Sequence, residues 1–283
     1  MFVWTYKANL RPFIDGLKKQ GQSIGFVPTM GALHRGHLAL VERSLHENDH
    51  TVVSIFVNPT QFDRKQDLET YPRFPEKDLA LLEKLDPEMI VYLPVAEDLY
   101  GGPVQREHFD LDGLDRVMEG RHRPGHFDGV ATVVKHLFEA VRPDRAYFGE
   151  KDFQQLRIIQ TLARKLNLPL QIVPVEIQRE ADGLAMSSRN LRLSEAHRKA
   201  APEIHRLLNL AREMALQGQN PEVIKKEINN RFKQNPLLEL EYFEIADEQT
   251  LQPARTFEPG KKYRAFTAVF AGDVRLIDNM PLY

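Results

Sequence analysis

Residues 23–57, SIGFVPTMGALHRGHLALVERSLHENDHTVVSIFV, carry the pattern of a strand, a loop, a helix and a second strand. Residues 23–27 form a short apolar run of strand length, and residues 37–46 have the apolar spacing of a helix. Residues 51–57 form the second strand, which ends before Pro59 because proline cannot donate to a central ladder. This succession predicts parallel strands joined by a crossover helix.

The same alternation continues outward from this stretch. We expect helices over 75–85, 129–141 and 152–166, and strands over 89–93, 145–148 and 170–173. Alternating strands and helices predict an α/β fold with a Rossmann-like, doubly wound parallel sheet. Such a sheet binds its ligand beyond the carboxyl ends of the strands.

The pattern changes after residue 176. Two amphipathic helices, near 195–217 and 221–232, precede antiparallel-looking strands at 238–245, 263–270 and 273–278. The sequence therefore predicts a Rossmann-like domain over residues 1–176 and a smaller α+β C-terminal domain over residues 177–283.

Composition excludes several classes of function. The 38 basic residues are balanced by 40 acidic ones, so no excess of positive charge is present for a nucleic-acid partner. The chain has no cysteine, which excludes disulfides, thiolate metal ligands and thiol nucleophiles. No segment approaches the roughly 20 apolar residues of a membrane span, and the N-terminus lacks a signal-peptide pattern. We therefore expect a cytoplasmic protein with no membrane partner.

PTMGALHRGH, residues 28–37, is the strongest local motif. His34 and His37 stand three apart and thus on one face of a helical turn. Unpaired backbone N–H groups at the helix start would hold phosphate while both imidazoles reach its oxygens. The alternatives are a simple helix cap and half of a zinc site, although no further ligand pair lies at the usual spacing. The HxGH form resembles that of the nucleotidylyltransferase superfamily.

AMSSRN, residues 185–190, is similar to the second phosphate-binding loop of that superfamily. Ser187 and Ser188 supply hydroxyl donors, and Arg189 supplies a guanidinium fork suited to phosphate oxygens. The alternative is an ordinary solvated loop.

FGEKDFQQL, residues 148–156, lies where a predicted strand ends and a helix begins. Gly149 lets the backbone approach a ligand, and Lys151 would place a fixed charge beside the reacting phosphate. Asp152 would cap the helix or hold a ribose hydroxyl, with Gln155 one turn further along. A solvated helix start is the alternative.

VNPTQF, residues 57–62, follows the second strand. The amides of Asn58 and Gln61 can both donate and accept, which suits a substrate with a hydroxyl and a carboxylate. Otherwise the segment is an ordinary turn.

Six motifs together resemble the pantothenate synthetase (pantoate–β-alanine ligase) family in identity, order and spacing: PTMGALHRGH, SIFVNPTQF, YPRFPEKDL, RPGHFDGVATVV, FGEKDFQQL and AMSSRNLRLS. The resemblance covers nearly the whole chain. It implies an ATP-dependent ligase that condenses (R)-pantoate with β-alanine through a pantoyl adenylate, giving pantothenate, AMP and pyrophosphate. It also implies Mg²⁺, a homodimer, and a nucleotide- and pantoate-binding role for the N-terminal domain.

The resemblance further implies roles for individual residues. His37 is the expected acid, and His34 and Lys151 are expected to be catalytic with it. Gln61 would contact pantoate and β-alanine, and Gln155 would contact pantoate, while Pro28, Met30 and Phe62 would pack against its dimethyl carbon. Asn58, predicted from its position after the strand, is a further substrate-binding candidate. The residues expected to bind ATP are Met30, Gly31, Ala32, Leu33, His34, Arg35, Gly36, His37, Gly149, Glu150, Lys151, Asp152, Gln178, Met186, Ser187, Ser188 and Arg189.

One departure from the family pattern concerns the metal. Members often have adjacent aspartates after the YPR segment, whereas this chain has Glu76, Lys77 and Asp78. The magnesium ligands are therefore left unassigned, since hydrated Mg²⁺ can be held mainly by phosphates.

Two alternative functions are open from the sequence. One is another HxGH nucleotidylyltransferase that keeps the nucleotide on its product. The other is a regulatory nucleotide-binding module that has lost catalysis. The presence of His34, His37, Lys151 and Arg189 argues against this alternative. The main hypothesis requires the HxGH loop and the Ser-Ser-Arg loop to act on one triphosphate.

Overall fold

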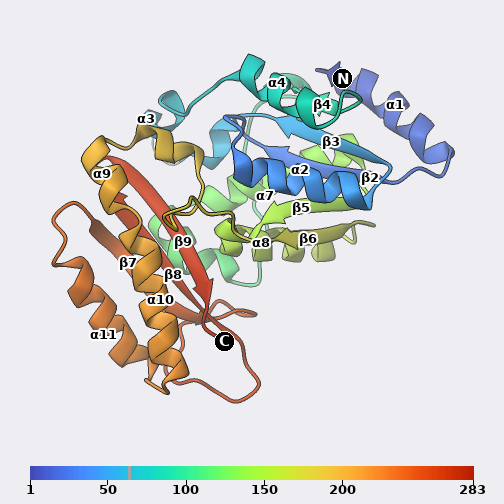
Figure 1. Ribbon diagram of the computed structural model, residues 1–283. Helices are drawn as coiled ribbons and strands as arrows, with labels where there is room; N and C mark the ends of the chain where they lie inside the picture. Colours follow the sequence, from blue (N-terminus) through green and yellow to red (C-terminus); the bar gives the residue numbers. More distant parts are fainter. Residues whose placement is uncertain (63–64) are drawn as a thin grey trace. The chain divides into compact units, whose positions relative to one another are not determined.

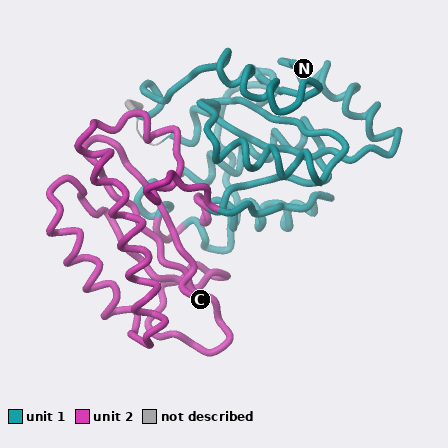
Figure 2. The backbone as a smooth tube through the Cα atoms, in the orientation of Figure 1, with its two compact units in different colours: residues 1–115, 119–150, 155–176 teal, residues 116–118, 151–154, 177–283 magenta. Residues whose placement is uncertain are grey.

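The computed structural model describes residues 1–62 and 65–283 (Figure 1). The chain forms two compact units, coloured separately in Figure 2. Unit 1 comprises residues 1–115, 119–150 and 155–176, and unit 2 comprises residues 116–118, 151–154 and 177–283.

Unit 1 contains a six-stranded sheet in the order β1-β4-β3-β2-β5-β6, and its strands pair in parallel. The strands are β1 Phe2–Trp4, β2 Ile24–Thr29, β3 His50–Ile55, β4 Ile90–Tyr92, β5 Arg145–Gly149 and β6 Gln171–Val175. The predicted doubly wound parallel sheet is thus confirmed. The helices are α1 Lys7–Lys19, α2 Arg35–Glu47, α3 Lys65–Glu69, α4 Pro75–Leu85, α5 Ala96–Tyr100, α6 Met118–His122, α7 His126–Val141 and α8 Phe153–Lys165, with short 3₁₀ turns η1 Pro59–Gln61, η2 Leu114–Arg116 and η3 Glu150–Asp152.

The strand order defines a topological switch point in this sheet. From β2 the chain proceeds through β3 and β4 in one direction, and it later returns to the other side of β2 with β5 and β6. The loops after β2 and β5 therefore leave the sheet side by side at its carboxyl edge. This is where open α/β sheets bind their ligands.

The strands are apolar because helices cover both faces of a parallel sheet. Val27, Val53 and Val91 are fully buried in one core cluster with Val41 of α2 and Leu82 of α4. This packing holds α2 and α4, and with them the loops at their N-termini, against the sheet.

Unit 2 is an antiparallel sheet of β7 Glu239–Asp247, β8 Tyr263–Ala271 and β9 Val274–Pro281, in that order. Its helices are α9 Glu195–Ala200, α10 Glu203–Leu216 and α11 Pro221–Phe232, and η4 spans Ser188–Arg192. The single helix expected over 195–217 is two helices. Pro202 separates them, because proline lacks the N–H that would continue the helical hydrogen-bond ladder.

No helix among the described residues is long and apolar enough to cross a membrane.

Candidate functional site

The loop between β2 and α2 is held by a buried carboxylate. Asp78 of α4 is 2% exposed, and its oxygens accept the backbone N–H of Ala32 at 2.9 Å and of Leu33 at 2.7 Å. Burial raises the pKa of Asp78, while the two amide donors oppose the shift. Gly31 and Ala32 adopt positive φ angles of 81° and 50°, and a Cβ on Gly31 would lie 3.0 Å from the Asp78 carboxylate. Asp78 thus fixes a tight loop conformation.

His34 and His37 form a reciprocal cap at the start of α2. His34 Nδ1 accepts the N–H of Gly36 at 3.1 Å, and His37 Nδ1 accepts the N–H of His34 at 3.4 Å. The ring centroids are 4.0 Å apart. Because Nδ1 accepts in both rings, each neutral imidazole carries its proton on Nε2. The cap therefore sets the tautomer in which Nε2–H is the donor.

The expectation of unpaired amides at the helix start is wrong for His34 and Gly36. The N–H groups of Ala32 and Leu33 go to Asp78, and those of His34 and Gly36 go to the two imidazoles. The side chains that accept these hydrogen bonds cannot be identified from the apolar spacing of the helix. The loop can still offer an anion its imidazole donors and the positive end of the α2 dipole.

The Gln61 turn lies beyond β3, the strand beside β2. The carbonyl of Gln61 accepts His126 Nδ1 at 2.7 Å and Arg123 Nη2 at 3.3 Å, and its Nε2 donates to the sulfur of Met30. Gln61 and Met30, two predicted substrate contacts, therefore touch. Sequence reasoning noted the RPGHFDG motif of Arg123 and His126 but gave it no role.

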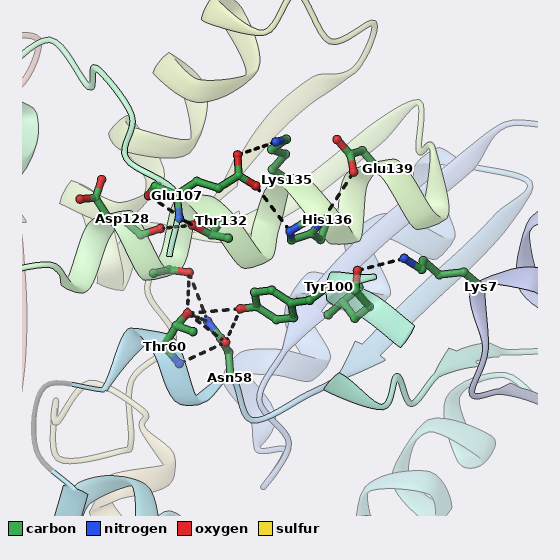
Figure 3. Close-up of polar contacts among 12 residues, drawn as sticks. Lys7, Asn58, Thr60, Tyr100, Glu107, Asp128, Thr132, Lys135, His136 and Glu139 are labelled. Carbon is green, nitrogen blue, oxygen red and sulfur yellow. Dashed lines mark hydrogen bonds and ion pairs between the residues drawn. The ribbon is translucent and has the colours of Figure 1, made fainter. Parts of the chain in front are cut away.

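Asn58 is 1% exposed, and its side chain makes its hydrogen bonds inside the protein. Its Nδ2 donates to Thr60 Oγ1 at 3.0 Å and to the carbonyl of Gly129 at 3.2 Å, and its Oδ1 accepts the Tyr100 hydroxyl at 2.7 Å. Figure 3 shows Thr60 and Tyr100 converging on this amide. Asn58 thus ties the Gln61 turn to α7 and α5, and its direct contact with substrate stays a prediction.

Replacing Asn58 with alanine is expected to lower the free energy of unfolding by about 1–3 kcal/mol, because buried partners lose their hydrogen bonds. Urea denaturation followed by circular dichroism measures the change. Asn230→Ala, at an exposed position of α11, is the matched control and should change stability by less than about 0.5 kcal/mol. Equal stability of the two variants would contradict the tethering role.

The remaining predicted residues of unit 1 lie at the same edge of the sheet. Pro28 is in β2, Phe62 follows η1 and packs edge-on against Tyr71 at 5.7 Å, and Gln155 is in the first turn of α8. Gly149 ends β5, and no described atom outside its chain neighbours lies within 4 Å of where its Cβ would be. The loops after the adjacent strands β3, β2 and β5 therefore all carry predicted site residues.

The other predicted residues belong to unit 2. Lys151 Nζ lies 3.5 Å from the carboxylate of Asp152. The carbonyl of Gln178 accepts the N–H of Met186 at 3.0 Å, which closes a hairpin. Ser187 caps η4, its Oγ accepting the N–H of Arg189 at 3.3 Å, and Ser188 is buried. This hairpin, residues 178–189, holds the Ser-Ser-Arg loop on a defined backbone.

Within the described ranges 1–62 and 65–283, no three His, Asp or Glu side chains are grouped as a metal site.

Comparison with known proteins shows similarity over the full length. The family model described as pantoate-beta-alanine ligase matches residues 3–281. Pantothenate synthetase of Christiangramia forsetii is 51% identical, covering 100% of this chain and 99% of that protein. The crystal structure of pantothenate synthetase from Thermus thermophilus has a TM-score of 0.92 at 42% identity, with 100% of both chains covered. A pantoate-beta-alanine ligase from Francisella tularensis, crystallised with beta-gamma ATP and beta-alanine, has a TM-score of 0.80 at 34% identity, covering 100% of this chain and 98% of that one.

Proposed function

The chain belongs to the pantoate–β-alanine ligase family, and from that premise we propose how its residues divide the work of the reaction. The enzyme is an AMP-forming acid–amino-acid ligase that uses ATP to condense pantoate with β-alanine into pantothenate. The observation that carries this assignment is the family match over residues 3–281.

The first step makes pantoyl adenylate. A pantoate carboxylate oxygen attacks the α-phosphorus of ATP, the bond to the β-phosphate oxygen breaks, and pyrophosphate leaves. Negative charge on the phosphate oxygens is stabilised by donors already in place. His37 and His34 supply Nε2–H donors, and Lys151 supplies a fixed positive charge. The tautomer set by the reciprocal cap supports this assignment.

ATP binding falls to three segments. They are the loop after β2, residues 149–152 after β5, and the hairpin of residues 178–189. In this assignment residues 1–176 form the nucleotide- and pantoate-binding domain, and residues 177–283 form the smaller C-terminal domain. The full set is Met30, Gly31, Ala32, Leu33, His34, Arg35, Gly36, His37, Gly149, Glu150, Lys151, Asp152, Gln178, Met186, Ser187, Ser188 and Arg189.

Pantoate is held by the amides of Gln61 and Gln155, with Pro28, Met30 and Phe62 against its dimethyl carbon. The contact between Gln61 and Met30 supports a site that joins polar and apolar groups. In the second step the β-alanine amine attacks the pantoyl carbonyl, loses a proton and displaces AMP.

Mg²⁺ would be held mainly by the phosphate oxygens of ATP and by water, because it retains water and needs few protein ligands, and it would neutralise charge on the departing pyrophosphate. No step of the reaction is assigned to the ion.

The enzyme acts as a homodimer in the cytoplasm, where its ATP substrate is made. Light scattering coupled to size-exclusion chromatography measures the particle mass, and a mass of one chain would contradict the dimer.

Leaving out each substrate in turn tests the reaction order. Pyrophosphate should appear with ATP and pantoate alone, whereas AMP should appear only after β-alanine is added. A nucleotidylyltransferase would instead keep the nucleotide on its product and release no AMP. Mass spectrometry of the products separates the two results.

A further inference from the structure

Lys151 lies in sequence between β5 and α8, but its backbone carbonyl is hydrogen-bonded to the C-terminal sheet. Asn279 of β9 donates from Nδ2 to the carbonyl of Lys151 at 2.8 Å. The guanidinium of Arg264 of β8 stacks over the ring of Phe153 at 3.9 Å from its centroid. Gln154 Nε2 donates to the carbonyl of Val117 at 2.9 Å. These contacts explain why residues 151–154 belong to unit 2.

The orientation of the Asn279 amide is determined by its second partner. Asn279 is 2% exposed, and its Oδ1 accepts Arg264 Nη1 at 2.6 Å. Arg264 also donates from Nε to Glu248 Oε1 at 2.8 Å. Rotating the amide by half a turn would place its NH₂ group against the guanidinium and its oxygen against the Lys151 carbonyl. The Nδ2 donor must therefore face Lys151.

The neighbouring residue of β9 holds the hairpin of residues 178–189. The Asp278 carboxylate accepts both terminal nitrogens of Arg179, at 2.6 and 2.9 Å. Arg179 Nη1 also donates to the carbonyl of Gly183 at 3.0 Å, across the turn of the hairpin. Such a bidentate pair constrains direction as well as distance. Arg179 Nη2 further approaches the carbonyl of Asn279 at 3.4 Å, so the two anchors are linked.

We propose that Asn279 is a positioning residue for ATP activation. Its hydrogen bond to the Lys151 carbonyl fixes Lys151 relative to the Ser-Ser-Arg loop, which the neighbouring residue Asp278 holds through Arg179. The proposal rests on the proposed role of Lys151 in adenylate formation. Through adjacent residues of β9, the ammonium of Lys151 and the donors of Ser187 and Arg189 form one rigid phosphate-binding group. A shift of about 1 Å at such a group is enough to cost on the order of a hundredfold in rate.

Asn279→Asp tests the proposal with little change of shape. The new carboxylate still accepts from Arg264 but cannot donate, and it places an oxygen against the Lys151 carbonyl. The rate of pyrophosphate release with ATP and pantoate should fall about tenfold to a hundredfold, with the KM for pantoate unchanged. Thr267→Val, which removes a buried hydrogen bond to the Tyr242 carbonyl in the same sheet, is the matched control and should keep the normal rate.

The same change in a Lys151→Ala background separates positioning from general damage. If Asn279 acts through Lys151, Asn279→Asp should slow the Lys151→Ala enzyme by less than about twofold, because coupled residues are not additive. An equal slowing in both backgrounds, or a normal rate for Asn279→Asp alone, overturns the inference. A normal rate for Lys151→Ala overturns the proposed role of the lysine itself, and the positioning proposal with it.

Thermal unfolding of each variant checks that it is folded at the assay temperature. If Asn279→Asp does not fold, Asn279→Ser replaces it, because serine removes the Nδ2 donor to the Lys151 carbonyl without adding a charge. The expected and contradicting outcomes are then the same.

Discussion

His37→Ala is expected to slow adenylate formation by on the order of a hundredfold or more, because a donor aimed at the charge developing on phosphate is lost. The Nδ1 atom of His37 accepts the N–H of His34, so the ring has its proton on Nε2, ready to donate. The measurement is the single-turnover release of pyrophosphate from ATP and pantoate without β-alanine. This isolates the first chemical step from the attack by the amine.

The control for this variant is His46→Ala, at the exposed end of the same helix. It removes an imidazole from α2 without touching the cap and should leave the rate unchanged. Loss of the cap alone costs about 1 kcal/mol of stability, which unfolding measurements will detect separately from the rate. A His37→Ala enzyme that turns over normally would remove this histidine from the reaction.

Gly129→Ala is expected to reduce kcat/KM for pantoate by on the order of a hundredfold, because the Gln61 turn must move. A methyl group at this position would lie 2.3 Å from the carbonyl oxygen of Thr60 and 2.9 Å from Cα of Gln61. Both obstacles are backbone atoms, and His126 and Arg123 hold the Gln61 carbonyl in place. The overpacking should also lower the free energy of unfolding by about 1–3 kcal/mol.

Gly16→Ala is the control, since no described atom beyond its chain neighbours and the nearby backbone of α1 lies within 4 Å of its Cβ position. There the added methyl should favour the helix by about 1 kcal/mol and leave kcat/KM unchanged. If Gly129→Ala keeps its kcat/KM for pantoate, then pantoate does not bind at η1.

Sequence patterns were sufficient to predict the architecture of the sheet and the location of its loops. Apolar runs and helical spacing repeat locally, so β2 to β6 and the helices α2, α4, α7 and α8 could be predicted within a few residues, whereas the five-residue helices α3, α5 and α6 were not. The exceptions have local causes. β1 is only three residues long, and Pro12 interrupts α1, whose buried Leu10 and Ile14 are otherwise spaced as in a helix. Pro202 split the helix expected over 195–217.

The amino-acid sequence by itself determined which side chains follow each strand, because parallel strands bring their carboxyl ends to one edge whatever the details of packing. Only the tertiary structure decided which hydrogen-bond partners hold those residues in place. Asp78 reaches Ala32 across 46 positions, and Asn279 reaches Lys151 across 128. Hydrogen bonds over such separations leave no periodicity in the chain, since their partners meet only after the sheet and helices have packed.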